Sequence, residues 1–347
     1  MALVRRIGAW AVSLLLLEVS VAAAEHQIVC SSEAAVGYAA FPDICRLKNG
    51  DLFCVFYSGY GHVSTPNDQW PKGGRIMAVR SSDNGQTWSK PVIVLDTEQD
   101  DRDPSVACLK DGTLLLNWFT LHQNRVAVLL ARSTDQGKTW SEPVTLKLDS
   151  PYSFACSSPV RQLPDGSLIL GLYHEEEKKN LAFGATVKSY DGGKTWKELA
   201  LIGEKSGVYL DAETDVVPLK DGRLLAALRS SKVDMHYAVS ENAGKTWGPV
   251  KSFGFKGHCP YFLRHSSGVI LLAHRVPATS LHWTTDEGKT WNGPVKIDTV
   301  GGAYPSMVEL PDGLVYCVYY EEGKASSIRV VRLRVDTKGV TVEGKQD

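Results

Sequence analysis

Ser133-Thr134-Asp135-Gln136-Gly137-Lys138-Thr139-Trp140 fits the pattern S-x-D-x-G-x-T-W, and this pattern recurs along the chain. Its Asp or Asn positions follow one another at intervals of about 44 to 56 residues, close to the repeat length of a propeller blade. Four more copies of the pattern lie at residues 81–88, 189–196, 240–247 and 284–291, and the last two of these each differ from it at one position.

The chemistry of the motif is that of a turn. The Asp carboxylate accepts backbone N–H groups of its own turn, and the Gly supplies a positive φ without steric cost. The Thr and Trp that follow restart a strand, with the indole covering the turn. We therefore expect the motif to be part of the scaffold and to lie away from any site.

A second repeat supports an all-β fold. Six turns of the Asn-Gly or Asp-Gly kind, one of them with Ser at the first position, are each followed by a short apolar or alternating run, which is typical of β-hairpins. These features predict a six-bladed β-propeller with four-stranded antiparallel blades, spanning residues 25–347 around a central channel. The last repeat ends with the alternating stretch 327–335. The turns are Asn49-Gly50, Asp111-Gly112, Asp165-Gly166, Asp221-Gly222, Ser267-Gly268 and Asp312-Gly313.

Residues 1–24 are predicted to be a secretory signal peptide. Arg5 and Arg6 precede a short apolar core, and Ala22-Ala23-Ala24 forms a cleavage site. The alternative is an uncleaved membrane anchor, which the shortness of the apolar core disfavours. We expect a secreted or periplasmic protein with no membrane attachment after cleavage.

Charge and cysteine content exclude further classes of partner. The net charge is −1 and no basic run stands out, which argues against nucleic-acid binding. The seven cysteines show no CxxC or Cys/His metal spacing. We expect no metal and no cofactor, and buried free thiols in preference to disulfides.

Strand direction locates the functional end of the channel. In each repeat the residue nine before the turn Gly and the residue seven after it should lie at the same end, with the S-x-D-x-G-x-T-W turns at the other. Charged and tyrosine side chains gather in these two rings, and charged residues are rarely buried without partners. The site is therefore predicted there; the alternative is a solvated rim. The rings are Phe41, Asp103, Ser158, Glu213, Cys259 and Tyr304, and Tyr57, Phe119, Tyr173, Arg229, Arg275 and Tyr320.

The first repeat also has an unusually long loop between Gly50 and Ser81. It carries Tyr60, His62 and Asp68. Loops of this length are usually functional. We expect it to overhang the ring of predicted site residues.

The repeats resemble the sialidase (neuraminidase) superfamily, whose Asp-boxes follow the same pattern. Members use a Tyr nucleophile paired with a Glu, and an Asp acid/base on an early loop. The resemblance implies that Tyr304 is the nucleophile and Glu213 its partner. It also implies that Asp68, or alternatively Asp43, is the acid/base.

Members also bind the substrate carboxylate with three arginines. Arg229 and Arg275 resemble the second and third of these, but Ala40 stands where the first is expected. Arg102, in the analogous place of the next repeat, could replace it. The expected substrate-binding residues are Arg229, Arg275, Arg102, Asp103, His62 and Tyr57.

These features predict a sialidase-like exo-glycoside hydrolase that acts with retention on a terminal sialic acid or a related acidic or deoxy sugar. The expected partner is a glycan or glycoconjugate. The alternative, favoured by Ala40, is a non-catalytic propeller that binds a glycan or a protein.

Overall fold

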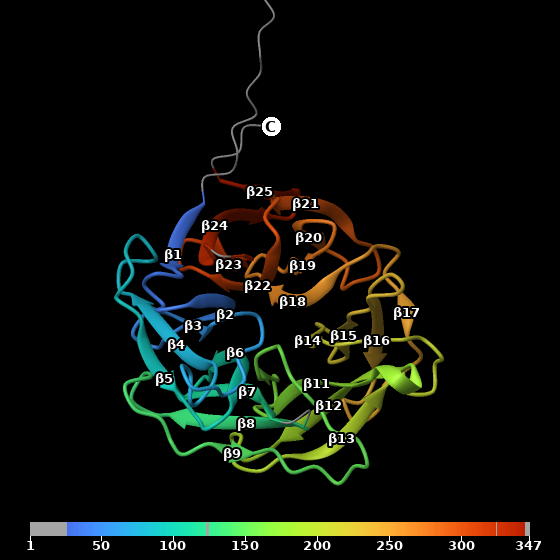
Figure 1. The fold of residues 1–347 in the computed structure, drawn as a ribbon. Helices are drawn as coiled ribbons and strands as arrows, with labels where there is room; N and C mark the ends of the chain where they lie inside the picture. Colours follow the sequence, from blue (N-terminus) through green and yellow to red (C-terminus); the bar gives the residue numbers. More distant parts are fainter. Residues whose placement is uncertain (1–25, 123–124, 324, 344–347) are drawn as a thin grey trace, which may run out of the picture.

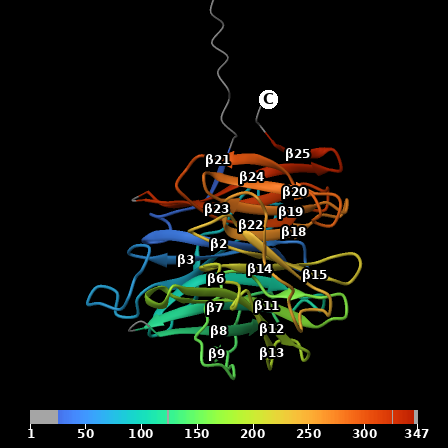
Figure 2. The same ribbon diagram turned by 90° about the vertical axis from the view of Figure 1, so that its right-hand side faces the viewer.

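The computed structural model describes residues 26–122, 125–323 and 325–343, so the predicted signal peptide lies outside the described residues. Six antiparallel sheets surround a central axis (Figure 1). The strands run along this axis in the side view (Figure 2). The six-bladed β-propeller predicted from the two repeats is confirmed. The helical structure among the described residues is a single 3₁₀ turn, η1 (Glu177–Lys179).

The blades follow one another in chain order, and the strand numbers below run from the channel outward. Blade 1 contains β2 (Tyr38–Arg46), β3 (Leu52–Gly59), β4 (Arg75–Ser81) and β5 (Val92–Leu95). Blade 2 contains β6 (Asp100–Cys108), β7 (Leu114–His122), β8 (Arg125–Ser133) and β9 (Val144–Thr145). Blade 3 contains β10 (Arg161–Gln162), β11 (Leu168–Glu176), β12 (Leu181–Ser189) and β13 (Lys197–Ile202). Blade 4 contains β14 (Thr214–Pro218), β15 (Leu224–Leu228), β16 (His236–Ser240) and β17 (Lys251–Ser252). Blade 5 is β18 (His258–Arg264), β19 (Ile270–Arg275), β20 (Thr279–Thr284), β21 (Asn292–Asp298).

Blade 6 closes the ring with strands from both ends of the described chain. It contains β22 (Gly302–Glu309), β23 (Val315–Glu321), β24 (Ser327–Asp336), β1 (Gln27–Ser31) and β25 (Gly339–Val342). The first half of β24 pairs with β1, and its second half pairs with β25. The outer position of this blade is therefore shared by two strands. The sequence repeats did not predict β1, because its partner lies about 300 residues away in the chain.

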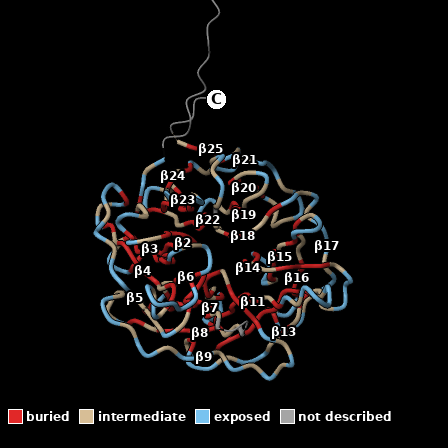
Figure 3. The backbone as a smooth tube through the Cα atoms, in the orientation of Figure 1, coloured by how far each residue is buried: buried red, intermediate tan, exposed pale blue. Residues whose placement is uncertain are grey.

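The core consists of apolar layers between neighbouring blades. Val55 of β3, for example, packs in one cluster with Leu116 and Trp118 of β7. Buried residues follow the inner strands of the blades, and exposed residues follow the connecting loops and outermost strands such as β5 and β9 (Figure 3). The seven cysteines are unpaired, and six of them are buried. Apolar burial between rigid sheets thus fixes the position of the channel residues.

The S-x-D-x-G-x-T-W turns have the hydrogen bonds expected of them. In the copy at residues 133–140, Asp135 accepts the backbone N–H of Thr139 at 2.9 Å and its hydroxyl at 2.6 Å. The Ser133 hydroxyl accepts the N–H of Gly137 at 2.8 Å. The strand register places Ser81 opposite Leu52 and Tyr57 opposite Ile76. The motif turns therefore lie at the opposite end of the blades from Tyr57.

These turns also join neighbouring blades, which the sequence did not reveal. The cation just before the motif in one blade donates to a backbone carbonyl in the motif of the next blade. This is seen for Arg80 with Gln136, for Arg132 with Gly192, and for Lys188 with Ala243. The motif therefore stabilises both its own turn and the contact between sheets.

We expect Asp135→Ala to lower the melting temperature by a few degrees while leaving turnover per folded molecule unchanged. The hydrogen bonds of the Thr139 side chain and backbone hold the pKa of Asp135 below its usual value. Its stabilising contribution is therefore present above the unfolded pKa of about 3.9 and is lost as the pH falls through the lower folded pKa. Melting curves at pH 7 and at pH 2 should show a smaller difference between variant and wild type at pH 2. Loss of activity with an unchanged melting temperature would contradict the scaffold role.

Candidate active site

Four inner strands carry the same local distortion at one end of the channel. Phe41, Asp103, Cys259 and Tyr304 each precede a proline and have φ values of 51°, 47°, 55° and 44°. Left-handed backbone is rare for residues with side chains, and a following proline disfavours helical backbone as well. Each strand has a β-bulge at this point. Such bulges re-aim side chains, and strain of this kind clusters at functional sites.

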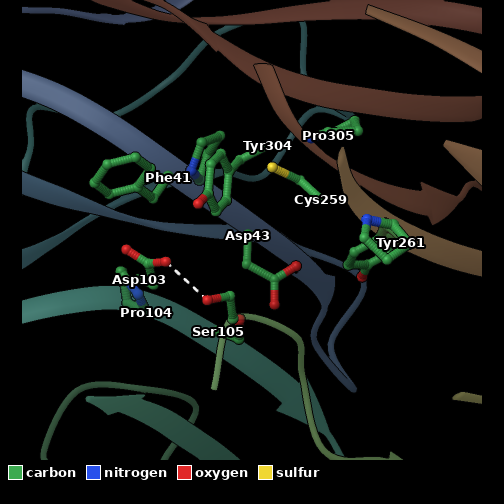
Figure 4. Close-up of a pocket in the computed structure, with 12 residues that line it drawn as sticks. Phe41, Asp43, Asp103, Pro104, Ser105, Cys259, Tyr261, Tyr304 and Pro305 are labelled. Atoms are coloured by element: carbon green, nitrogen blue, oxygen red, sulfur yellow. Dashed lines mark hydrogen bonds between the residues drawn. The ribbon is translucent and has the colours of Figure 1, made fainter. Parts of the chain in front are cut away.

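The same four residues line one pocket (Figure 4). This end of the channel, marked by Phe41, Asp103, Cys259 and Tyr304, is called the mouth below. The pocket holds about 310 Å³ of space, including its opening. The prolines that follow the four residues complete much of its wall. The repeated bulge thus gives each of four blades one side chain in a common hollow.

The mouth brings Tyr304 and Glu213 together from different blades. Tyr304 lies in β22 of blade 6, and Glu213 directly precedes β14 of blade 4. The Tyr304 hydroxyl donates a hydrogen bond of 2.6 Å to Glu213 Oε1. Glu213 is 1% exposed, whereas Tyr304 is only partly buried. A short hydrogen bond to a buried carboxylate is the arrangement required for an activated hydroxyl nucleophile.

The surrounding charges keep the two groups in complementary protonation states. Burial alone would raise the pKa of Glu213, but the Arg229 charge and the Tyr304 hydrogen bond outweigh it and lower that pKa. Burial and the negative charge of Glu213 raise the pKa of Tyr304 well above its usual value. Glu213 is therefore a carboxylate and Tyr304 a neutral phenol at neutral pH. The carboxylate is placed to take the phenolic proton.

Arg229 and Arg275 both reach the mouth but have different partners. Arg229 Nη1 donates to both oxygens of Glu213, at 2.7 and 3.0 Å. Among the described residues Arg275 donates only to the Gly302 carbonyl, at 3.2 Å, and its guanidinium lies 5.4 Å from the centre of the Tyr304 ring. Arg229 thus balances the charge of the buried carboxylate. Arg275 retains donors for an anionic group beside Tyr304.

Arg102 is buried beside the mouth, with its guanidinium over the rings of Phe41, Tyr57 and Phe119 at 5.6 to 5.9 Å. Its Nη1 donates to the His62 carbonyl at 2.7 Å and lies 3.6 Å from Asp100. These contacts occupy the guanidinium with protein groups.

Two more of the predicted substrate-binding residues are buried at this side of the mouth. Tyr57 is fully buried and donates to Asp100 at 2.7 Å. Asp103 is 4% exposed and accepts the Ser157 hydroxyl at 2.8 Å, the hydrogen bond drawn in Figure 4. Its other oxygen, Oδ1, is buried without a hydrogen bond among the described residues. Burial raises the pKa of Asp103 to about 6, although the Arg102 charge opposes this.

Among the described residues, neither carboxylate considered for the acid/base is hydrogen-bonded to Tyr304 or Glu213. Asp68 is exposed in a turn whose backbone is bonded to Asn67, and within the described chain no hydrogen bond or ion pair joins Asp68 to the mouth. Asp43 lines the pocket but accepts hydrogen bonds from Ile44, Val106 and Ser306. These partners belong to blades 1, 2 and 6, so Asp43 ties three inner strands together.

One carboxylate at the mouth was missed by the sequence reasoning. Glu322 follows β23 and accepts the hydroxyls of Tyr38 at 2.7 Å and Tyr320 at 2.9 Å. His62, on the long loop, lies 3.7 Å from it. The position of Glu322, two residues after the ring position Tyr320, was the only available signal. Among the described residues no group of three or more metal-ligating side chains occurs, and no described helix is long and apolar enough to span a membrane.

Ala40 stands where the first of the three carboxylate-binding arginines is expected. Ala40 is fully buried and lies opposite Tyr57 in the β2–β3 ladder, next to the ring that Arg102 covers. Ala40→Arg should therefore bury a second, unpaired guanidinium, destabilise the fold by on the order of 3 kcal/mol, and leave sialoside hydrolysis no faster. Ala40→Leu is the uncharged control for side-chain size. A stable Ala40→Arg variant with faster sialoside hydrolysis would contradict this expectation.

Comparisons with known sequences identify the family of the chain. Residues 73–317 match the protein family described as "BNR repeat-like domain". The sialidase of Micromonospora viridifaciens is 25% identical over 330 residues, which cover 81% of this chain and 49% of that protein. The sialidase of Bacteroides fragilis is 26% identical over 201 residues, covering 48% of this chain and 36% of that protein. The chain thus spans about half the length, or less, of these relatives.

Solved structures show the same fold. A protein of unknown function from Dyadobacter fermentans superposes with a TM-score of 0.78 at 21% identity, covering 91% of this chain and 100% of that one. The Hadza microbial sialidase Hz136 superposes with a TM-score of 0.73 at 18% identity, covering 91% and 69%. At these identities the likeness concerns the fold alone.

Proposed function

The chain belongs to the BNR repeat-like domain family of sialidase-type propellers, and from this premise we propose that it is a retaining exo-glycoside hydrolase. Its substrate is a terminal sialic acid or a related acidic or deoxy sugar of a glycan or glycoconjugate. Its nucleophile is Tyr304, with Glu213 as the base. Export by the signal peptide predicted for residues 1–24 would bring the enzyme to such glycans outside the cytoplasm.

The observation that carries this proposal is the 2.6 Å hydrogen bond from Tyr304 to the buried Glu213. A carboxylate nucleophile would repel an anionic sugar acid, whereas a neutral phenol does not. Sialidases are the recognised exception to the usual pair of carboxylates in glycosidases. The lowered pKa of Glu213, which results from Arg229 outweighing burial, keeps the base ready at neutral pH.

The chemistry then proceeds in two steps. Tyr304 Oη attacks the anomeric carbon while Glu213 takes the phenolic proton, and the glycosidic bond breaks as the leaving oxygen takes a proton from an acid or from solvent and departs as the alcohol. In the second step a water attacks the same carbon and gives up a proton to the conjugate base of that acid or to solvent, the bond to Tyr304 breaks, and Glu213 returns its proton to the Tyr304 oxygen. Two inversions give net retention. Arg275 binds the acidic group of the sugar, and Arg229 holds Glu213 as a carboxylate.

A panel of 4-nitrophenyl glycosides tests the proposal. It should include sialic acid, other keto-sugar acids, and neutral and deoxy sugars. We expect turnover on at least one acidic or deoxy sugar, with a product of retained anomeric configuration by NMR. An inverted product would contradict the Tyr304 mechanism, and the absence of turnover on every member would contradict the enzymatic function.

The alternative is a non-catalytic propeller that binds a glycan or a protein. It is favoured by the buried Ala40 and by the contacts that occupy Arg102. Calorimetric titration with the same sugars distinguishes the two functions. Binding without turnover supports the alternative, whereas turnover excludes it.

A further inference from the structure

The long loop of blade 1 is held over the mouth by two buried charged residues. Arg102 Nη1 donates to the His62 carbonyl at 2.7 Å, and the Ser64 N–H donates to Asp100 Oδ2 at 3.0 Å. Asp100 is fully buried and Arg102 is 7% exposed. Hydrogen bonds to buried charges are among the strong ones. The backbone on both sides of residue 63 therefore has a fixed position relative to blade 2.

This anchoring places the His62 ring close to the nucleophile. The ring packs edge-on against Phe41, with 5.0 Å between centroids, and Phe41 in turn packs against Tyr304 at 4.8 Å. One aromatic ring thus separates His62 from Tyr304. The His62 side chain is 50% exposed, so a ligand can reach it from solvent.

The two ring nitrogens of His62 have different surroundings. Nδ1 lies 3.4 Å from the Tyr38 hydroxyl and 3.7 Å from Glu322 Oε2. Among the described residues Nε2 has no hydrogen-bond partner. The Glu322 carboxylate on the Nδ1 side of the ring, at 3.7 Å, favours a proton on Nδ1, so that Nε2 can exchange protons with a ligand. Nε2 is thus left available at the mouth.

Glu322 has a defined orientation of its own. It accepts the Tyr38 hydroxyl at 2.7 Å and the Tyr320 hydroxyl at 2.9 Å. Two phenols from different strands therefore fix the carboxylate that faces His62. General acid–base catalysis requires a group that exchanges protons and a second group that orients it. His62 and Glu322 have this arrangement.

We infer that His62 is the general acid and base of the proposed glycosidase, and that Glu322 is its positioning residue. This inference rests on the proposed function. In the first step the His62 imidazolium gives its Nε2 proton to the leaving oxygen as the glycosidic bond breaks. In the second step neutral His62 takes a proton from the water that attacks the anomeric carbon. His62 is thereby restored to its protonated starting state, and the net reaction is hydrolysis.

The charged and titratable groups facing His62 are Glu322, Arg102, Arg275 and Tyr38. Burial and the two arginines lower the pKa of His62, and Glu322 only partly opposes them. The imidazolium therefore exists mainly below the ordinary histidine value of about 6.5. Hydrolysis that needs the acid should fall as the pH rises through this lowered pKa.

Leaving-group dependence tests the inference. The substrates are the methyl and 4-nitrophenyl glycosides of a sugar that the wild type hydrolyses, because only the methyl glycoside needs a proton to leave. We expect His62→Asn to lower kcat/KM at least about 100-fold on the methyl glycoside and less than about tenfold on the 4-nitrophenyl glycoside. Azide, which needs no base, should restore turnover of the latter. The decline of wild-type activity with rising pH on the methyl glycoside should disappear in the variant.

Two further variants sharpen the test. Glu322→Gln should shift the pH profile on the methyl glycoside and cause a smaller loss of the same kind. His236→Asn, on β16 of blade 4, should behave as wild type. Melting curves confirm that each variant folds.

Equal losses on both glycosides, or no loss, would overturn the assignment of His62. So would a selective loss on the methyl glycoside in Asp103→Asn with His62→Asn unaffected. A wild type that hydrolyses neither glycoside of any sugar in the panel would instead contradict the proposed function itself.

Discussion

Tyr304→Phe is expected to abolish turnover, with kcat on the best substrate falling by at least about a thousandfold. The substitution removes only the hydroxyl that bonds Glu213 at 2.6 Å, and the ring contacts with Phe41 and Tyr320 can persist. The fold should therefore survive. Kinetics on the 4-nitrophenyl glycoside and a melting curve of the same sample provide the measurement.

Tyr319→Phe is the matched control. Tyr319 is fully buried in blade 6, and its hydroxyl bonds Asp298 at 2.7 Å, within the apolar layer between blades 5 and 6. It should lose some stability and keep its activity. Full activity of Tyr304→Phe would move the nucleophile to a carboxylate of the mouth, of which Asp103 is the candidate. Trapping with a slow, activated fluorosugar and mass spectrometry of the labelled peptide would identify it.

Arg275→Leu is expected to lower kcat/KM on acidic glycosides by about 10- to 100-fold, since a hydrogen bond between charged groups contributes about 1.5–3 kcal/mol. Neutral glycosides should change by less than about threefold. The reason is that, within the described part of the chain, Arg275 donates only to the Gly302 carbonyl and so has donors left for the substrate. Arg275→Lys, which keeps the charge but not the planar fork, should be intermediate. Equal losses on acidic and neutral substrates would refute the carboxylate-binding role.

Arg229→Leu is expected to differ in kind, because Arg229 bonds both oxygens of Glu213. Without it burial dominates, and the pKa of Glu213 should rise. A base must be deprotonated to act, so the acid limb of the pH profile should move to higher pH on every substrate. A loss confined to acidic glycosides would show instead that Arg229 binds substrate.

Local sequence was sufficient for the blades and for the placement of Phe41, Asp103, Cys259 and Tyr304 at the mouth, whereas Ser157, and not the predicted ring residue Ser158, lines the pocket. Hairpin turns such as Asp221-Gly222 and the turn around Asp135 depend on neighbours within a few residues. The alternation of a strand then dictates which side chains reach one end. The pairing of Tyr304 with Glu213 was implied by the family resemblance, and the repeat added only that both residues lie at the same end of the channel.

The closing strand and the roles of the charged residues could not be read in this way. β1 pairs with β24 across nearly the whole chain, so its role depends on ring closure. Arg102 was predicted to bind substrate, but its guanidinium is in contact with the His62 carbonyl and Asp100. No repeat position indicates which of several nearby acceptors a long side chain will choose.

The sequence by itself determined the propeller, the scaffold role of its repeated turns, and the end of the channel that carries Tyr304, because turns and strand alternation are local. Only the tertiary structure decided which charges at the mouth are neutralised by protein and which remain free. It showed Arg229 bound to Glu213, and Glu322 oriented by Tyr38 toward the long loop. The physical reason is that hydrogen bonds and charge interactions across the channel join residues from different blades, and their geometry exists only once the ring has closed.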